Sequence, residues 1–199
     1  MNLTDQQLQD FEDDGYLFLP GVFTGAEVAV LNAEVPGIFA QERPEVWREK
    51  GTRSVRTAFA AHTYNEAFGR LAHHPRLIGP VMQLLGGAVY VHQFKINGKA
   101  AFDVEVWQWH QDYGTWARDD LMPEPRAINV ALFLDDVTEF NGALMIIPKS
   151  HKRGVLEAGH DLATTSYPLW TLDNDGDRAV GGRGRPDCAQ GRGGLDVDV

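Results

Sequence analysis

The chain has 199 residues, 43% of them hydrophobic and 23% charged, which is the size and composition of one globular domain. A formal net charge of −10 argues against a nucleic-acid partner, no apolar run approaches the roughly 18–20 residues of a membrane-spanning helix, and one cysteine, Cys188, excludes a disulfide framework. The first residues are polar and acidic, unlike a secretory signal or transit peptide, so we expect a cytoplasmic protein.

The first half of the chain is predicted to be mostly helical. A capping box at 4–7 starts a short helix that Gly15 ends, and a short strand follows at 16–19. A second capping box at 24–27 starts a helix that we expect to stop before Pro36, since proline cannot donate a helical hydrogen bond. Helical periodicity indicates two further helices, at 65–73 and 76–85.

The second half is rich in β-branched and aromatic residues with a period of two, which is typical of strands. The expected strands are 89–96, 104–109, 127–134 and 143–147. Asn97-Gly98 and Asn141-Gly142 are predicted turns. Several short strands after a helical section favour a mainly β fold, a sandwich or barrel with N-terminal helices.

The composition divides the chain into two parts. Residues 1–176 hold every aromatic residue and every histidine, and we interpret them as the folding domain. Residues 177–199 contain six glycines, four arginines and four aspartates but no aromatic residue. We therefore expect an aberrant tail, either frame-shifted or naturally disordered.

The segment WQWHQD, residues 107–112, holds the residues with the clearest chemistry. His110 and Asp112 are two positions apart, so on a strand their side chains would point to the same face. An imidazole and a carboxylate converging there are two-thirds of the facial triad that binds non-heme Fe(II). The alternative is a hydrogen-bonded histidine at a polar strand end. Three nearby tryptophans, at 107, 109 and 116, would either wall a pocket or pack in the core.

Longer motifs around this pair resemble a known family. WHQD is followed by PRAxxxxLFLDD and NGALxxxPxSH, and the chain opens with LTxxQLxxFxxDGYLFLPGVFTGAEV. In this order the motifs are similar to the phytanoyl-CoA dioxygenase superfamily of Fe(II)- and 2-oxoglutarate-dependent oxygenases, nearest to ectoine hydroxylases and related amino-acid hydroxylases. The resemblance covers roughly residues 3–174. It implies a double-stranded β-helix, the jelly-roll or cupin-like fold, here incomplete at its C-terminal end.

The resemblance also implies roles for single residues. His110 and Asp112 would be catalytic iron ligands, and Trp116 and Arg126 would lie in the substrate pocket. The residues implied to bind the cosubstrate are Gln93, Asn97, Trp107 and Asn129. Each has a structural alternative: a strand-edge or turn residue, a satisfied buried amide, core packing or, for Arg126, an ion pair with a local acid.

The implied reaction is hydroxylation of a small, possibly amino-acid-like substrate with Fe(II), 2-oxoglutarate and O2. Relatives that halogenate have a small residue in place of the aspartate, so Asp112 favours hydroxylation. Where ectoine hydroxylases have an acidic residue before Thr-Trp, this chain has Gly114, which leaves the substrate open. The alternative function is a non-catalytic jelly-roll module that binds a small ligand without iron.

The third ligand of the triad is expected to be missing. The family's distal histidine follows a strand resembling GSMLMFH, and this chain has the tail instead; neither His151 nor His160 matches it. With chosen synonymous codons, residues 188–199 read one base later become APKGAAGSMLMF, close to that strand. We therefore expect an out-of-frame or truncated product with open sheet edges, weak iron binding and little turnover.

Overall fold

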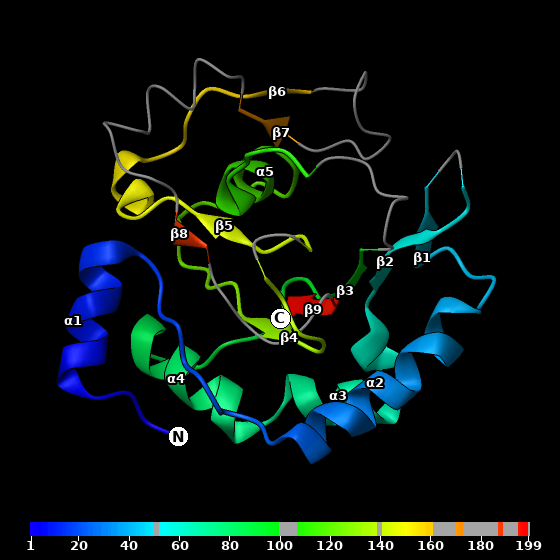
Figure 1. Ribbon diagram of the computed structural model, residues 1–199. Coiled ribbons are helices and arrows are strands. Elements are labelled where there is room, and N and C mark those ends of the chain that lie inside the picture. Colours follow the sequence, from blue (N-terminus) through cyan, green and yellow to red (C-terminus); the bar gives the residue numbers. More distant parts are fainter. Residues whose placement is uncertain are drawn as a thin grey trace.

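A computed structural model of the protein describes residues 1–49, 52–99, 107–138, 141–160 and 170–172, together with the backbone of 187–188 and 195–198. Helices α2, α3 and α4 lie on one side of a central sheet, and α5 lies on the other side with the strands β6 and β7 (Figure 1). Within the described part of the chain, no helix is long and apolar enough to cross a membrane.

The two N-terminal helices start at the predicted capping boxes. In α1 (Asp5–Asp14) the hydroxyl of Thr4 accepts from the amide of Gln7, and Gly15 ends the helix with a φ of 85°. In α2 (Gly25–Phe39) Thr24 caps the first turn in the same way. Both predicted starts are confirmed. The strand predicted at 16–19 is wrong, because those residues form an irregular connection between the two helices.

The predicted end of the second helix is also wrong, since α2 passes through Pro36 and ends at Phe39. Proline costs the helix one hydrogen bond and strains the turn before it. That cost falls only one turn from the helix end. It is offset because two nearby residues of the helix, Val35 and Ile38, are 4% and 1% exposed and pack in the core.

Two more predicted helices are confirmed as α3 (Glu66–Ala72) and α4 (Pro75–Leu85). Asn65 caps α3 through its side chain, and Gly86 ends α4 in the left-handed conformation. Short 3-10 turns occur at Ala61–Thr63 and Ser150–Arg153, and the helix α5 spans Asp112–Asp119.

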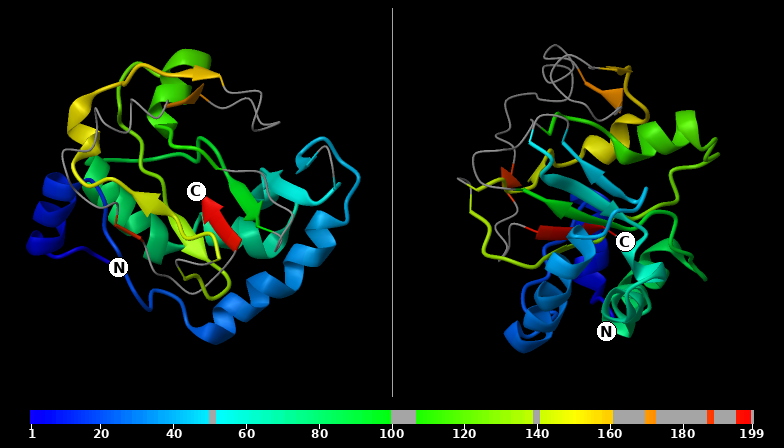
Figure 2. Two further views of the ribbon diagram at one scale, coloured as in Figure 1. Left: turned by 45° about the horizontal axis from the view of Figure 1, so that its top comes forward. Right: turned by 90° about the vertical axis from the view of Figure 1, so that its right-hand side faces the viewer.

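The central sheet is antiparallel and has five strands in the order β1-β2-β3-β9-β4. Their bounds are Val46–Arg48, Val55–Phe59, Lys95–Gly98, Leu195–Asp198 and Ala131–Phe133. Two smaller sheets pair β5 (Met145–Ile146) with β8 (Asp187–Cys188) and β6 (Gly159–His160) with β7 (Trp170–Thr171). The side view in Figure 2 separates the helices α2 and α5, with the sheet between them.

The predicted strands are only partly right. Of 89–96 only the last two residues belong to β3, and Asn97-Gly98 continues that strand because Asn97 pairs with Thr57 of β2. The described end of 104–109 is irregular, while 104–106 lie outside the described residues. The strands at 127–134 and 143–147 shorten to β4 and β5, and the turn at 141–142 is confirmed. Strands β1 and β2 were not predicted.

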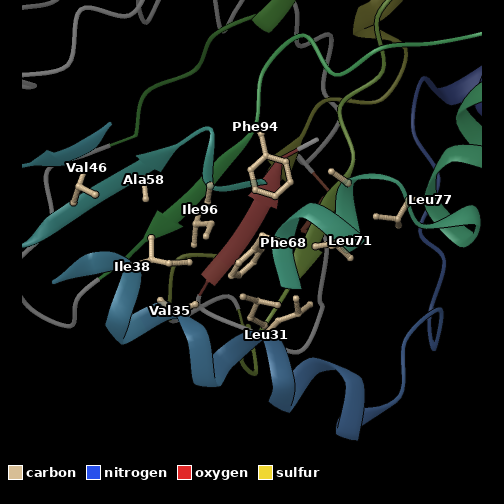
Figure 3. Close-up of a cluster of buried hydrophobic side chains, with 13 residues drawn as sticks. Leu31, Val35, Ile38, Val46, Ala58, Phe68, Leu71, Leu77, Phe94 and Ile96 are labelled. Carbon is tan, nitrogen blue, oxygen red and sulfur yellow. The ribbon is translucent and has the colours of Figure 1, made fainter. Parts of the chain in front are cut away.

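The hydrophobic core lies between the central sheet and helices α2 and α3 (Figure 3). Phe68 of α3 is fully buried, and its ring meets that of Phe94 edge-on at 6.2 Å. Ala58 and Ile96, opposite each other on β2 and β3, complete the sheet side of this contact. The opposite side of β2 and β3, which carries Thr57 and Asn97, is therefore left for polar groups.

The sheets do not form a closed barrel in the part of the chain that is described. The segment 177–199 contains two of the described strands, β8 and β9, so its backbone pairs with the domain. Strand β9 lies between β3 and β4 in the central sheet.

Candidate metal and cosubstrate site

His110 and Asp112 meet as predicted, although not on a strand. His110 lies in the irregular segment before α5, and Asp112 is the first residue of that helix. Nε2 of His110 and Oδ1 of Asp112 are 3.3 Å apart, with the side chains 25% and 27% exposed. Two atoms bound at right angles to one metal ion, each at about 2.1 Å, would be about 3 Å apart. The pair therefore has the spacing of adjacent metal ligands.

Each side chain of the pair is oriented by one further contact. Nδ1 of His110 lies 2.7 Å from the carbonyl oxygen of Gln108, which favours a proton on Nδ1 and leaves Nε2 to bind a metal. Oδ2 of Asp112 accepts from Nδ2 of Asn129 at 2.8 Å, which turns Oδ1 toward the histidine. Both contacts are of the kind that supports metal ligands in proteins.

The two groups also set each other's charge. Burial lowers the pKa of His110, but the hydrogen bond to Asp112 and the charge of that carboxylate outweigh burial, and the pKa is raised. Burial works against ionisation of Asp112, but His110 and the charge of Lys95 keep its pKa well below the usual range. Asp112 is thus a carboxylate at neutral pH, as a metal ligand must be.

A cavity of about 520 Å³ adjoins the pair and collects four of the predicted site residues: Gln93, Trp116, Arg126 and Asn129. Its apolar wall is the face of α4 that carries Leu77, Ile78, Val81 and Leu85. A more open hollow of about 600 Å³ beside α3 contains none of the predicted residues. The cavity next to Asn129 is therefore the candidate substrate site.

Two of these lining residues have further contacts. The ring of Trp116 meets that of His92 edge-on at 5.2 Å. Arg126 donates through Nη2 to the carbonyl of Leu85 at the end of α4, and among the described residues it forms no ion pair. The local ion pair considered for Arg126 is therefore not found in the described part of the chain, and a role with a substrate carboxylate stays a prediction.

The other two predicted cosubstrate residues, Asn97 and Trp107, do not line this cavity. Asn97 is 2% exposed, and its Oδ1 accepts from the hydroxyl of Thr57 at 3.0 Å. The indole N–H of Trp107 is buried and has no acceptor among the described residues. A buried donor without an acceptor is costly unless a ligand supplies one, so the Trp107 side of the site fits a bound oxygen-rich molecule.

Two lysines of this site were missed by the sequence reasoning. Lys95 and Lys99 alternate with Asn97, so all three project from one side of the chain. Nζ of Lys99 lies 5.7 Å from the centre of the Trp107 ring and donates to the carbonyl of Gly142. The sequence FKINGK, residues 94–99, has polar side chains at every second position, and this alternation could have indicated the two lysines. It was not used because 97–98 was interpreted as a turn. The two ammonium groups make this side of the site cationic.

No group of three His, Cys, Asp or Glu side chains suited to a metal ion is found in the described ranges. His151 contacts the carbonyl of Glu12 in α1, and the ring of His160 packs on Trp170, 4.1 Å between centres. Neither histidine therefore lies with the His110–Asp112 pair, and the described candidate site consists of this pair, two lysines and a cavity.

A histidine–aspartate pair of this geometry, at the start of α5 and beside a cavity, defines a candidate mononuclear metal centre. The chain belongs to the phytanoyl-CoA dioxygenase (PhyH) family, whose model matches residues 11–180. This confirms the family resemblance of the sequence.

The chain is similar to several characterised members. It is 44% identical to L-proline trans-4-hydroxylase of Streptomyces griseoviridis over 144 residues, 72% of this chain and 54% of that protein. It is 40% identical to ectoine dioxygenase of Bordetella parapertussis over 157 residues, 76% of this chain and 50% of that protein. The chain therefore spans about half the length of the curated relatives it matches.

The fold is similar to that of EctD from S. alaskensis, whose crystal structure contains 2-oxoglutarate and 5-hydroxyectoine. The TM-score is 0.83 at 28% sequence identity, and the match covers 98% of this chain and 67% of that one.

Proposed function

We propose that the protein is an Fe(II)- and 2-oxoglutarate-dependent dioxygenase that hydroxylates an unactivated C–H bond of a small, amino-acid-like substrate in the cytoplasm. The observation that carries the proposal is the His110–Asp112 pair, with its ligand atoms 3.3 Å apart and each side chain held by a further contact. Similarity to a proline hydroxylase and to ectoine dioxygenases supports the substrate class.

The residues present fit an iron ion and a bound 2-oxoglutarate. Nε2 of His110 and Oδ1 of Asp112 would hold the iron, while Lys99 and the buried N–H of Trp107 offer a cation and a donor for 2-oxoglutarate. When bound, iron and 2-oxoglutarate consume O2: one oxygen atom enters succinate as CO2 is lost, and the other is inserted into the C–H bond. The cavity beside Asn129 would hold the substrate, with its apolar wall excluding water.

We further propose that the three sheets belong to a double-stranded β-helix of the cupin type. The TM-score of 0.83 with EctD supports this architecture. The face of β2 and β3 that carries Thr57 and Asn97 would then be the interior of the jelly roll, since the opposite face packs on α2 and α3.

A metal titration tests the proposed centre. The 199-residue chain should bind Co(II), an optical substitute for Fe(II), under anaerobic conditions, and His110→Ala and Asp112→Ala should each abolish the absorption change. His151→Ala is the matched control, because that histidine contacts α1. A spectrum that neither site variant changes would favour the alternative function, a ligand-binding module without iron.

We also propose that this chain, with a frame-shifted tail from about residue 177, turns over slowly because the family's distal histidine is missing. Succinate release with Fe(II), 2-oxoglutarate and either L-proline or ectoine should be low, and it should rise in a chain continued in the family's frame. Equal release from both chains would reject this part of the proposal. The genomic locus provides a second test: a single open frame through the tail would contradict the frame shift.

A further inference from the structure

The most deeply buried ion pair among the described residues has no part in the proposed reaction. Nη1 of Arg56, on β2, lies 2.9 Å from Oε1 of Glu49, and the two side chains are 2% and 5% exposed. Glu49 stands just after β1, where its backbone bonds with Ser54 and Arg53 across the β1–β2 connection. The pair is thus fixed by β2 and by the connection between β1 and β2.

Stability alone is a weak reason for such a pair. Removing two charges from water costs several kcal/mol per ion, and apolar residues of similar volume often stabilise a fold equally well or better. An arginine held this rigidly can act through the flat face of its guanidinium, which stacks on aromatic rings.

Arg56 makes such a stacking contact with the site. Its guanidinium carbon lies 4.3 Å from the centre of the Trp107 ring. The Lys99 ammonium lies 5.7 Å from the same ring centre, so the indole contacts two cations from neighbouring strands. Two cations within about 6 Å hold a tryptophan ring more firmly than packing alone.

Trp107 is also joined to the metal ligands through the chain. The next residue, Gln108, supplies the carbonyl that orients Nδ1 of His110. A rotation of the backbone at Trp107 would therefore turn this carbonyl away and release the imidazole. The contacts run from Glu49 to Arg56, from Arg56 to Trp107, and from Trp107 along the backbone to His110.

We propose that the buried Glu49–Arg56 ion pair is a positioning device for the site: it holds the Trp107 indole, and through it the segment that presents His110. The proposal rests on the proposed function for the role of His110. Arg56 is a positioning residue here, since it acts on the site through Trp107.

Three variants separate positioning from stability. Arg56→Met removes the cation that lies 2.9 Å from the buried Glu49 carboxylate, so its melting temperature should fall. Glu49→Leu/Arg56→Met removes both charges and should recover the melting temperature. It should still bind Co(II) about 10- to 100-fold more weakly than the unchanged protein, the range found when support of a metal ligand is lost. Arg56→Lys retains the charge but loses the flat stacking face. Its Co(II) affinity should therefore lie between that of the unchanged protein and that of the double variant.

A metal-free measurement keeps this test independent of the proposed function. Hydrogen exchange of the amides at 107–111 should be faster in the double variant, because the segment is no longer held. The control is Arg43→Met/Glu45→Leu, which removes an ion pair and an arginine–aromatic stacking contact elsewhere in the protein. There Arg43 pairs with Glu45 at 2.9 Å and stacks on Tyr64 at 3.5 Å. This control should leave both Co(II) affinity and exchange at 107–111 unchanged.

The outcomes are distinct. A double variant with recovered stability, unchanged Co(II) affinity and unchanged exchange at 107–111 would overturn the positioning role and leave a purely structural pair. Faster exchange at 107–111, with Co(II) binding that His110→Ala does not affect, would support the positioning of the segment while rejecting the proposed metal centre.

Discussion

At the scale of single residues, the two metal-ligand candidates are held by different kinds of partner. His110 is oriented by a backbone carbonyl, which substitutions at Gln108 cannot remove directly. Asp112 is oriented by the side-chain amide of Asn129, which one substitution removes. The aspartate is therefore the ligand whose support can be tested cleanly.

Asn129→Ala should weaken Co(II) binding by about tenfold, because Asp112 loses the donor that turns Oδ1 toward His110. Anaerobic titration followed by absorption measures the change. Gln9→Ala is the control, since it removes an amide–carboxylate bond to Asp13 on the surface of α1 and should leave Co(II) affinity unchanged. An unchanged affinity in Asn129→Ala would mean that Asp112 needs no such support.

The sequence allowed the His110–Asp112 pair to be singled out because both residues lie in a short motif with other motifs in fixed order around it. Arg56 could not be found in this way. Its role depends on its burial in β2 and on its contact with the Trp107 ring. That contact joins residues tens of positions apart, and no local pattern encodes it.

At the scale of elements, the start of α2 is joined to α4 by an ion pair. Glu27, in the first turn of α2, accepts from the guanidinium of Arg76 and from Thr24, and these bonds lower its pKa to about 2. Nη1 of Arg76 also donates to the carbonyl of Val22, so one arginine holds both the helix start and the connection before it.

Glu27→Gln should lower the stability of the protein at neutral pH, and the difference should vanish on acidification. A carboxyl whose pKa is lowered in the folded state stabilises that state above its unfolded value of 4.5, and the contribution is lost as the pH falls toward 2. Glutamine can still complete the capping box, so the variant isolates the charge. Urea unfolding of both proteins between pH 2 and 7 provides the comparison.

Glu66→Gln is the control for this series, because its pair with Arg70 is 79% exposed on both sides and surface pairs of this kind contribute little. A pH-independent difference between Glu27→Gln and the unchanged protein would show that the carboxylate charge does not join the two helices.

Helix starts could be predicted and strands could not, for a physical reason. The capping boxes at Thr4 and Thr24 are complete within four residues, so the local sequence determines them. Asn97-Gly98 has the local preference of a turn, but pairing with β2 and β9 places it in a strand. Pro36 shows the same effect, since burial of its neighbours outweighs its local cost.

At the scale of the whole molecule, one core joins the helical layer to the sheet that carries the site. Phe94 packs on Phe68 of α3 and on His62, with ring centres 6.2 and 4.8 Å apart. The next residue is Lys95, whose charge acts on Asp112 and which lines the cavity. The position of β3, and with it the cationic side of the site, therefore depends on how the core packs beneath it.

Phe68→Ala should lower the free energy of unfolding by about 3–5 kcal/mol, because the site is fully buried and the cavity left behind cannot close against both α2 and the sheet. Urea unfolding followed by circular dichroism measures the loss. Phe18→Ala removes the same ring at a position that is 51% exposed, so it should change stability by only about 0.5 kcal/mol. A loss below about 1 kcal/mol in Phe68→Ala would mean that the helices and the sheet do not share one packed core.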